Sequence, residues 1–139
     1  MNRTDVQRWI DAYERAWRSP GTEQLATVFS PEITYLTSPW DEPVVGLDDL
    51  ARFWEHERAG ADEGFTMHSE VVAVEGRTAV VRVSVHYDDP AVGRWRDLWV
   101  LRFTPAGRCA VFEEWPFAPA PDSAPPAPPP DRGPLTRAP

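Results

Sequence analysis

The chain contains no lysine, a single cysteine and more acidic than basic side chains. Its 139 residues include 14 basic residues, all of them arginine, and 22 acidic residues, which gives a net charge of −8. This balance argues against nucleic acids and membranes as partners, because phosphate-rich surfaces repel an acidic chain. One cysteine, Cys109, excludes an internal disulfide and fits a reducing compartment, so we expect a cytoplasmic protein.

Long apolar runs and the common catalytic signatures are also missing. No run approaches the about 20 apolar residues that a membrane span needs, and the first residues contain no apolar signal segment. There is no glycine-rich phosphate loop, GxSxG elbow, HExxH motif or CxxC pair. His68 and Glu70 could supply two metal ligands from one strand face, but without a confirmed third ligand the signal is weak. With His86 on the neighbouring strand, they are more simply read as a polar surface that faces solvent or a dimer partner. We therefore expect neither a metal nor a cofactor.

Aromatic residues and prolines are abundant, and they divide the chain in two. Seven tryptophans, three tyrosines and six phenylalanines are many for one domain of this length. Nine of the last 22 residues are proline, and that segment has almost no large apolar side chain. Such a segment cannot offset its ordering entropy by burial. We expect a folded domain over residues 1–118 and a proline-rich disordered tail over residues 119–139.

Helical periodicity dominates the first part of the chain. The first helix is expected to start at Thr4, with Gln7 as the capping-box partner. Its apolar stripe consists of Val6, Trp9, Ile10, Tyr13 and Trp17. A short second helix is expected over 22–29 and a third after Gly46, with one strand over 33–36 between them.

Alternating apolar residues predict four antiparallel strands in the second part of the chain, over 65–75, 78–88, 95–103 and 109–117. Helices that precede a run of strands indicate an α+β fold. We expect a cone-shaped barrel in which a curved, mostly antiparallel sheet packs against three N-terminal helices and encloses a cavity.

The last two strands place carboxylates among aromatic side chains. Strict alternation puts Asp97 on one face with Trp99, and Glu113 on one face with Cys109 and Trp115. A buried carboxylate costs several kcal/mol unless it is partnered or used. Two neighbouring carboxyl groups raise each other's pKa and can serve as acid and base near neutral pH. Asp97 and Glu113 are therefore the main catalytic candidates.

Two alternatives to this interpretation stay open. One is that an arginine at the rim (Arg94, Arg96 or Arg102) pairs with a carboxylate. The other is that a bulge in the last strand turns Glu114 inward in place of Glu113.

Aromatic side chains supply the remaining candidates. Tyr13 is the third catalytic candidate, because its helical stripe must face the sheet and a tyrosine hydroxyl can stabilise a developing enolate. The expected ligand-binding residues are Trp17, Tyr35, Trp40, Trp54, Tyr87, Trp99 and Trp115. The simpler alternative for each is core packing with one hydrogen bond.

Four groups of residues carry a family resemblance. They are Trp9…Tyr13…Ala16-Trp17, Leu25-Ala26…Phe29-Ser30, Tyr35…Ser38-Pro39…Gly46 and Gly107-Arg108-Cys109…Glu113-Glu114-Trp115. Over roughly residues 4–117 the chain resembles the SnoaL-like branch of the nuclear transport factor 2-like superfamily. The resemblance implies a cone-shaped α+β barrel with a deep apolar pocket, often dimeric through the outer face of the sheet. Members include ketosteroid isomerases, epoxide hydrolases, dehydratases and polyketide cyclases, but neither the isomerase nor the hydrolase residue set maps onto this chain.

Two functions follow as hypotheses. The first is a cofactor-independent isomerase, cyclase, dehydratase or hydrolase that acts on a small apolar or polycyclic molecule. The second is a non-catalytic ligand-binding or dimerisation module. A homodimer is expected because the outer sheet face is apolar. The residues assigned to that face are Val72, Val74, Val80, Leu98, Val100 and Phe112.

Overall fold

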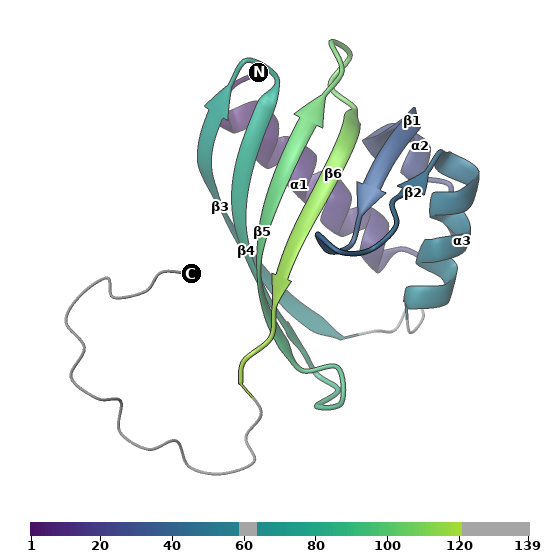
Figure 1. Ribbon diagram of the computed structural model, residues 1–139, viewed down its shortest axis with the longest axis vertical. Helices are drawn as coiled ribbons and strands as arrows, with labels where there is room; N and C mark the ends of the chain where they lie inside the picture. The colour runs from purple at the N-terminus through teal and green to yellow at the C-terminus, as the bar shows by residue number, and fades with distance from the viewer. Residues whose placement is uncertain (59–63, 121–139) are drawn as a thin grey trace, which may run out of the picture.

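The computed structural model describes residues 1–58 and 64–120. The elements are α1 (Arg3–Arg18), α2 (Leu25–Val28), β1 (Phe29–Leu36), β2 (Val44–Val45), α3 (Leu47–Glu57), β3 (Phe65–Glu75), β4 (Thr78–Tyr87), β5 (Arg94–Phe103) and β6 (Cys109–Phe117) (Figure 1). The expected tail lies outside the described residues from residue 121 onward. No described helix is long and apolar enough to cross a membrane.

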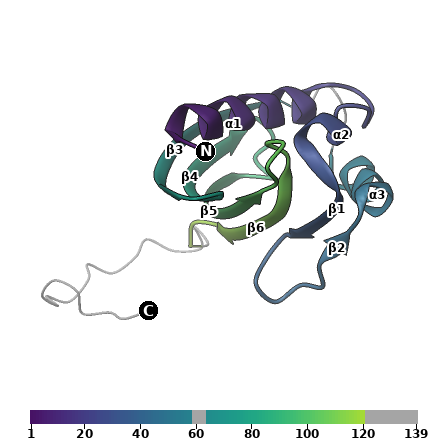
Figure 2. The ribbon, with the colours of Figure 1, turned by 90° about the horizontal axis from the view of Figure 1, so that it is seen from above.

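The six strands form one curved sheet in the order β2-β1-β6-β5-β4-β3. Neighbouring strands are antiparallel except β1 and β6, which pair in parallel. The expected α+β architecture with a mostly antiparallel sheet is confirmed, although the sheet stays open because its edge strands β2 and β3 do not pair. Figure 2 shows α1 lying along the concave side of the sheet, with α3 beside β1 and β2.

The start of α1 differs from the expectation. Asn2, rather than Thr4, is the N-cap. Its capping-box partner is Asp5 and not Gln7. The Asn2 side chain accepts a hydrogen bond from the Asp5 N–H, and the Asp5 carboxylate accepts one from the Asn2 N–H. This reciprocal pair satisfies two otherwise unpaired donors of the first turn. The expected apolar stripe is otherwise confirmed, with Trp17 partly buried at its end.

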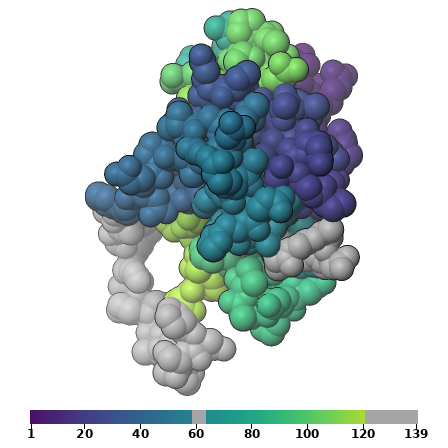
Figure 3. All heavy atoms as spheres, turned by 90° about the vertical axis from the view of Figure 1, so that its right-hand side faces the viewer, coloured from purple at the N-terminus to yellow at the C-terminus, as the bar shows by residue number. Residues whose placement is uncertain are grey.

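Pairing with segments distant in the sequence determines where the strands of residues 29–45 begin and end. β1 begins at Phe29, four residues before the expected strand, because Phe29 pairs with Cys109 of β6. The two-residue strand β2, which alternation did not predict, pairs with the end of β1. Figure 3 shows α3 covering this side of the molecule, next to the segment between β1 and β2.

Two bulges determine which side chains face inward. In β6, Phe103 is opposite Cys109 and Arg102 is opposite Val111, so Ala110 is an extra residue. In β3, the extra residue is Val72. Beyond each bulge the inward side chains change parity.

The bulges correct part of the expected outer face. Phe112 is fully buried and Val74 packs against the core, so neither belongs to that face. Leu98 lies there as expected, and Trp115 and Phe117 join it, with exposed fractions of 36%, 38% and 61%.

Candidate functional site

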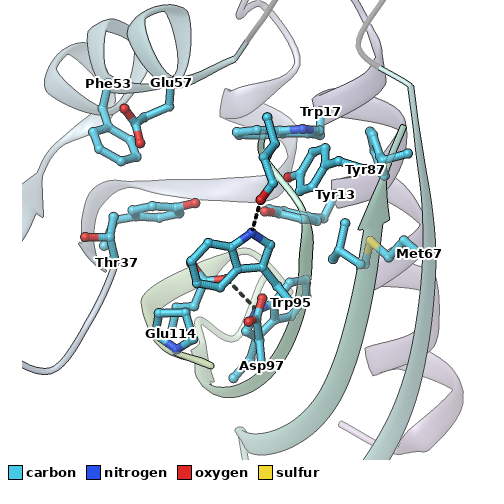
Figure 4. A pocket seen from close by; sticks show the side chains of 16 residues that line it. Tyr13, Trp17, Thr37, Phe53, Glu57, Met67, Tyr87, Trp95, Asp97 and Glu114 are labelled. Carbon is cyan, nitrogen blue, oxygen red and sulfur yellow. Dashed lines mark hydrogen bonds between the residues drawn. The ribbon is translucent and has the colours of Figure 1, made fainter. Parts of the chain in front are cut away.

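A cavity of about 370 Å³ lies between α1, α3 and the concave face of the sheet. Figure 4 shows its walls: Tyr13 and Trp17 come from α1, Phe53 and Glu57 from α3, and Trp95 and Asp97 from β5. Eight of the sixteen lining residues are aromatic, and none of the described lining residues is basic. The volume falls in the range of small-molecule sites, which are mostly apolar with a few polar groups.

Asp97 and Glu114 meet inside this cavity. Trp99 of β5 is directly opposite Glu114 of β6, and Asp97 lies two residues before Trp99 on the same face. The two carboxyl groups hydrogen-bond to each other, and the Trp99 indole N–H donates to Glu114 Oε2 over 3.2 Å. Asp97 is 7% exposed, and its Oδ1 atom is buried with no hydrogen-bond partner among the described residues.

Burial and proximity change the acidity of both groups. The pKa of Glu114 is raised well above its usual value by burial, by the negative charge of Asp97 and by the hydrogen bond to Asp97. Burial also raises the pKa of Asp97, against the opposing effect of the hydrogen bond from Glu114. Two carboxyl groups can hydrogen-bond to each other only when one of them carries a proton, so the pair shares a proton, and the negative charge of Asp97 favours its position on Glu114. The open alternative of a rim arginine as partner is not observed. Neither carboxylate forms a described ion pair with Arg94, Arg96 or Arg102.

Two tyrosine hydroxyls lie near the carboxyl pair. The ring of Phe112 is stacked between Tyr13 and Tyr35, with centroid distances of 5.7 and 4.6 Å. The two hydroxyl groups hydrogen-bond to each other, and burial raises the pKa of both phenols. Each hydroxyl is therefore neutral and available as a fixed dipole at the cavity wall.

The expectation that Glu113 faces the cavity is wrong. The bulge at Ala110 places Phe112 and Glu114 inward, so Glu113 lies on the opposite face and accepts a hydrogen bond of 2.9 Å from the Trp115 indole. Trp115 shares that outer face, so it does not line the cavity either. The open alternative of a bulge that turns Glu114 inward is the arrangement observed.

The other aromatic candidates divide into three groups. Tyr13, Trp17, Tyr35, Tyr87 and Trp99 line the cavity, as expected. Trp54 is fully buried behind the wall, where its ring packs on Trp17 at 4.7 Å and on Tyr13 at 5.7 Å. Trp40 is 95% exposed and does not line the cavity.

Sequence reasoning missed several lining residues, two of which carried a recognisable signal. Trp95 shares the parity of Asp97 and Trp99 on β5, and its indole donates to the Val92 carbonyl over 3.0 Å (Figure 4). Glu57 follows Phe53 by four residues on α3, a spacing that places both on one helical face. Thr37 lies just beyond β1, where no periodic pattern marks it.

The described residues offer no metal centre of the usual kind. No group of three or more histidine, cysteine, aspartate or glutamate side chains comes together within residues 1–58 and 64–120. His68, Glu70 and His86 are exposed, and Glu70 forms an ion pair with Arg82. Cys109 is buried, and burial raises the pKa of its thiol, which disfavours the thiolate.

Comparison with known proteins gives a family match and a fold match. The SnoaL-like domain family model matches residues 6–112. An NTF-2 like protein of unknown function from Burkholderia xenovorans superposes with a TM-score of 0.65 at 15% identity, covering 86% of this chain and 89% of that one. A ketosteroid isomerase-like protein from Erwinia carotovora gives 0.60 at 20% identity, covering 86% and 100%.

A third solved structure agrees with these two. It is a protein of unknown function with a cystatin-like fold from Methylobium petroleophilum, with a TM-score of 0.67 at 14% identity over 89% of this chain and 83% of that one. No curated protein matches the sequence. At such low identities these likenesses concern the fold alone.

Proposed function

Because the chain belongs to the SnoaL-like domain family, we propose that its cavity binds a small, largely apolar molecule and that Asp97 and Glu114 exchange protons with that molecule. The observation that carries the proposal is the hydrogen-bonded carboxyl pair among aromatic walls. Burying two acidic groups without a basic partner lowers stability, and strongly perturbed carboxyl groups in a cleft are typical of functional sites.

Each carboxyl group has its own role, which depends on whether it holds the shared proton. Asp97 acts as the base, because it lines the cavity and its Oδ1 atom accepts no hydrogen bond from another described residue. It takes a proton from a carbon that lies between the ligand carbonyl and a carbon–carbon double bond, while neutral Glu114 gives its proton to the carbonyl oxygen, which leaves a dienol. Asp97 then returns its proton to the far end of the former double bond and the dienol O–H returns its proton to Glu114, so that the carbonyl is restored and the double bond is conjugated with it. Protons and electrons balance without a cofactor.

The surrounding residues support this chemistry. The Tyr13 and Tyr35 hydroxyl groups can orient the ligand oxygen, because burial keeps them neutral and Phe112 fixes their rings. The aromatic walls bury the apolar part of the ligand and exclude water. The name of the Erwinia carotovora protein refers to ketosteroids, and we propose apolar carbonyl compounds as the general class for this chain.

Substitution of the two carboxyl groups tests the proposal. An apolar β,γ-unsaturated ketone serves as the probe, since its conversion to the conjugated isomer is visible by ultraviolet absorbance. We expect Asp97→Asn to lower kcat/KM about 10²–10⁴-fold, and Glu114→Gln to lower it less, because the amide still donates a hydrogen bond. Glu113→Gln is the matched control, because it makes the same change one residue away on the opposite face.

The outcomes separate the two candidate functions. A parent-like rate in Asp97→Asn would remove the catalytic role. Saturable binding without turnover in the parent protein would favour the second function, that of a ligand-binding module. The aromatic lining of the cavity by itself supports that function.

A further inference from the structure

The charged groups that line the cavity all have the same sign. They are the Asp97–Glu114 pair at the base and Glu57 on α3, and no arginine or histidine is among the described lining residues. The lining therefore has acidic groups at both ends and no basic group among its described residues. An anionic ligand would meet repulsion throughout such a cavity.

Glu57 stands at the end of the cavity away from the carboxyl pair. In Figure 4 its carboxylate lies beside Phe53, with Trp17 of α1 on the same side of the cavity and Asp97 and Glu114 at the other. Glu57 is exposed and forms no hydrogen bond or ion pair with another described residue. By contrast, Glu55 of the same helix pairs with Arg58 at 3.2 Å.

The aromatic walls suit a positive charge. The faces of tryptophan, tyrosine and phenylalanine rings attract cations, most strongly where water is excluded. Phe53 lies beside Glu57, and Trp17 lies on the same side of the cavity (Figure 4). A carboxylate next to aromatic faces is a recurring arrangement for binding substituted ammonium groups.

Two guanidinium groups lie close to the wall, but both are already partnered. Arg18 stacks on Phe65 at 3.7 Å and pairs with Glu14 at 2.9 Å. Arg58 lies 5.9 Å from the Trp17 ring centroid, and it donates to the carbonyl groups of Ser19 and Gly21. Neither side chain lines the cavity, so neither neutralises Glu57.

We propose that the ligand is an organic cation, with a protonated amine at the end that faces Glu57 and an apolar body that reaches the Asp97–Glu114 pair. This inference rests on the proposed function, because it assumes that the cavity binds an apolar molecule. It adds that the substrate class is an apolar amine with its reacting group at the far end. Neutral analogues bind more weakly, and carboxylic acids most weakly.

Three probes with one aromatic body test the charge preference. They are 2-(1-naphthyl)ethylamine, 2-(1-naphthyl)ethanol and (1-naphthyl)acetate, titrated calorimetrically at pH 7 and low ionic strength, where surface charges are least screened. We expect the amine to bind roughly tenfold more tightly than the alcohol, and the acetate to bind least. Equal or tighter binding of the alcohol would overturn the inference.

Glu57→Gln locates the preference within the cavity. It should bring the affinities of the amine and the alcohol to within about threefold of each other, because the amide keeps the shape and loses the charge. The alcohol itself should bind Glu57→Gln as it binds the parent. Glu32→Gln is the matched control, because Glu32 is exposed on β1 and does not line the cavity, and it should keep the full preference. An unchanged preference in Glu57→Gln would also overturn the inference.

These results distinguish this inference from the proposed function. If none of the three probes binds, the apolar binding site is lost and both proposals fail. If the alcohol binds as well as the amine while Asp97→Asn abolishes turnover, only the organic cation is excluded.

Discussion

Asp97 and Glu114 are the residues whose surroundings differ most from those of ordinary acidic side chains. Each lines a largely apolar cavity, and neither forms a described ion pair with a basic side chain. The proton that the two groups share reduces the cost of burial, because only one negative charge is desolvated. The same proton makes the stability of the fold depend on pH.

The first prediction concerns this pH dependence. The pKa of Glu114 is raised in the folded protein, so its contribution to stability is complete below the unfolded-state pKa and is lost as the pH rises toward the folded-state pKa. Over that window the free energy of unfolding should fall by about 1.4 kcal/mol per pH unit. Glu114→Gln has no such proton, so its stability advantage over the parent should grow from pH 5 to pH 8.

Urea unfolding of both proteins at several pH values measures this difference. Glu113→Gln should follow the parent, because Glu113 is on the outer face. Parallel stability profiles for the parent and Glu114→Gln would contradict a proton shared inside the cavity.

Among the elements, β6 and α3 do most to position the site. The bulge at Ala110 allows Cys109, Phe112 and Glu114 to share the inner face of β6. At the end of α3, Arg58 connects two helices: its guanidinium donates to carbonyl groups at the C-terminal end of α1, including Ala16 and Ser19. This contact satisfies carbonyl groups that the last turn of α1 leaves unpaired.

The second prediction concerns Arg58. Its side chain is 5% exposed, so Arg58→Met should leave several carbonyl groups unpaired and lower the free energy of unfolding by about 2–4 kcal/mol. Arg58→Lys should recover only part of this loss, because a single ammonium group cannot reproduce the planar fork of a guanidinium.

Arg52→Met is the control from the same helix. Arg52 forms an exposed ion pair with Asp49 three residues before it, and its loss should change stability by no more than about 0.5 kcal/mol. Thermal and urea unfolding measure all three variants. Equal effects at positions 52 and 58 would show that the helix connection is not important for stability.

At the scale of the whole molecule, one face of the sheet is covered and the other is not. The helices lie on the concave side (Figure 2). On the outer face, Leu98, Trp115 and Phe117 remain exposed. Contiguous apolar surface of this kind is typical of protein–protein interfaces. The homodimer expected from the sequence therefore stays a prediction, with a corrected set of residues.

The third prediction is that Leu98→Asp weakens the dimer. Leu98 lies at the middle of the outer face, and a charge there should raise the dimer Kd at least about 30-fold, which corresponds to the loss of an interface hot spot. Sedimentation velocity at micromolar concentrations measures it. Val45→Asp is the control, because Val45 is 55% exposed but lies on the edge strand β2. A parent protein that sediments only as a monomer would contradict the prediction.

Local patterns were sufficient for most of the elements and for the fold class. The apolar stripe of α1 and the alternation along β4 each involve residues close in sequence, so their periods of 3.6 and 2 are legible without a structure. The same reasoning placed Asp97 and Trp99 on one inner face, and the structure confirms that both line the cavity. The start of α1 was wrong by one or two residues because two acceptable capping pairs follow each other.

Which side chains face the cavity could not be predicted from local patterns, because it depends on pairing between distant segments. The choice of Glu114 over Glu113 depends on one extra residue in β6, which is set by how β6 pairs with β1 and β5 and not by any local pattern. Whether Trp54 lines the cavity or packs behind it depends on the rings of α1 opposite it. Sequence periodicity thus indicated which residues share a face, whereas strand register and packing determined which of those faces enclose the cavity, because both arise only when segments far apart in the chain meet.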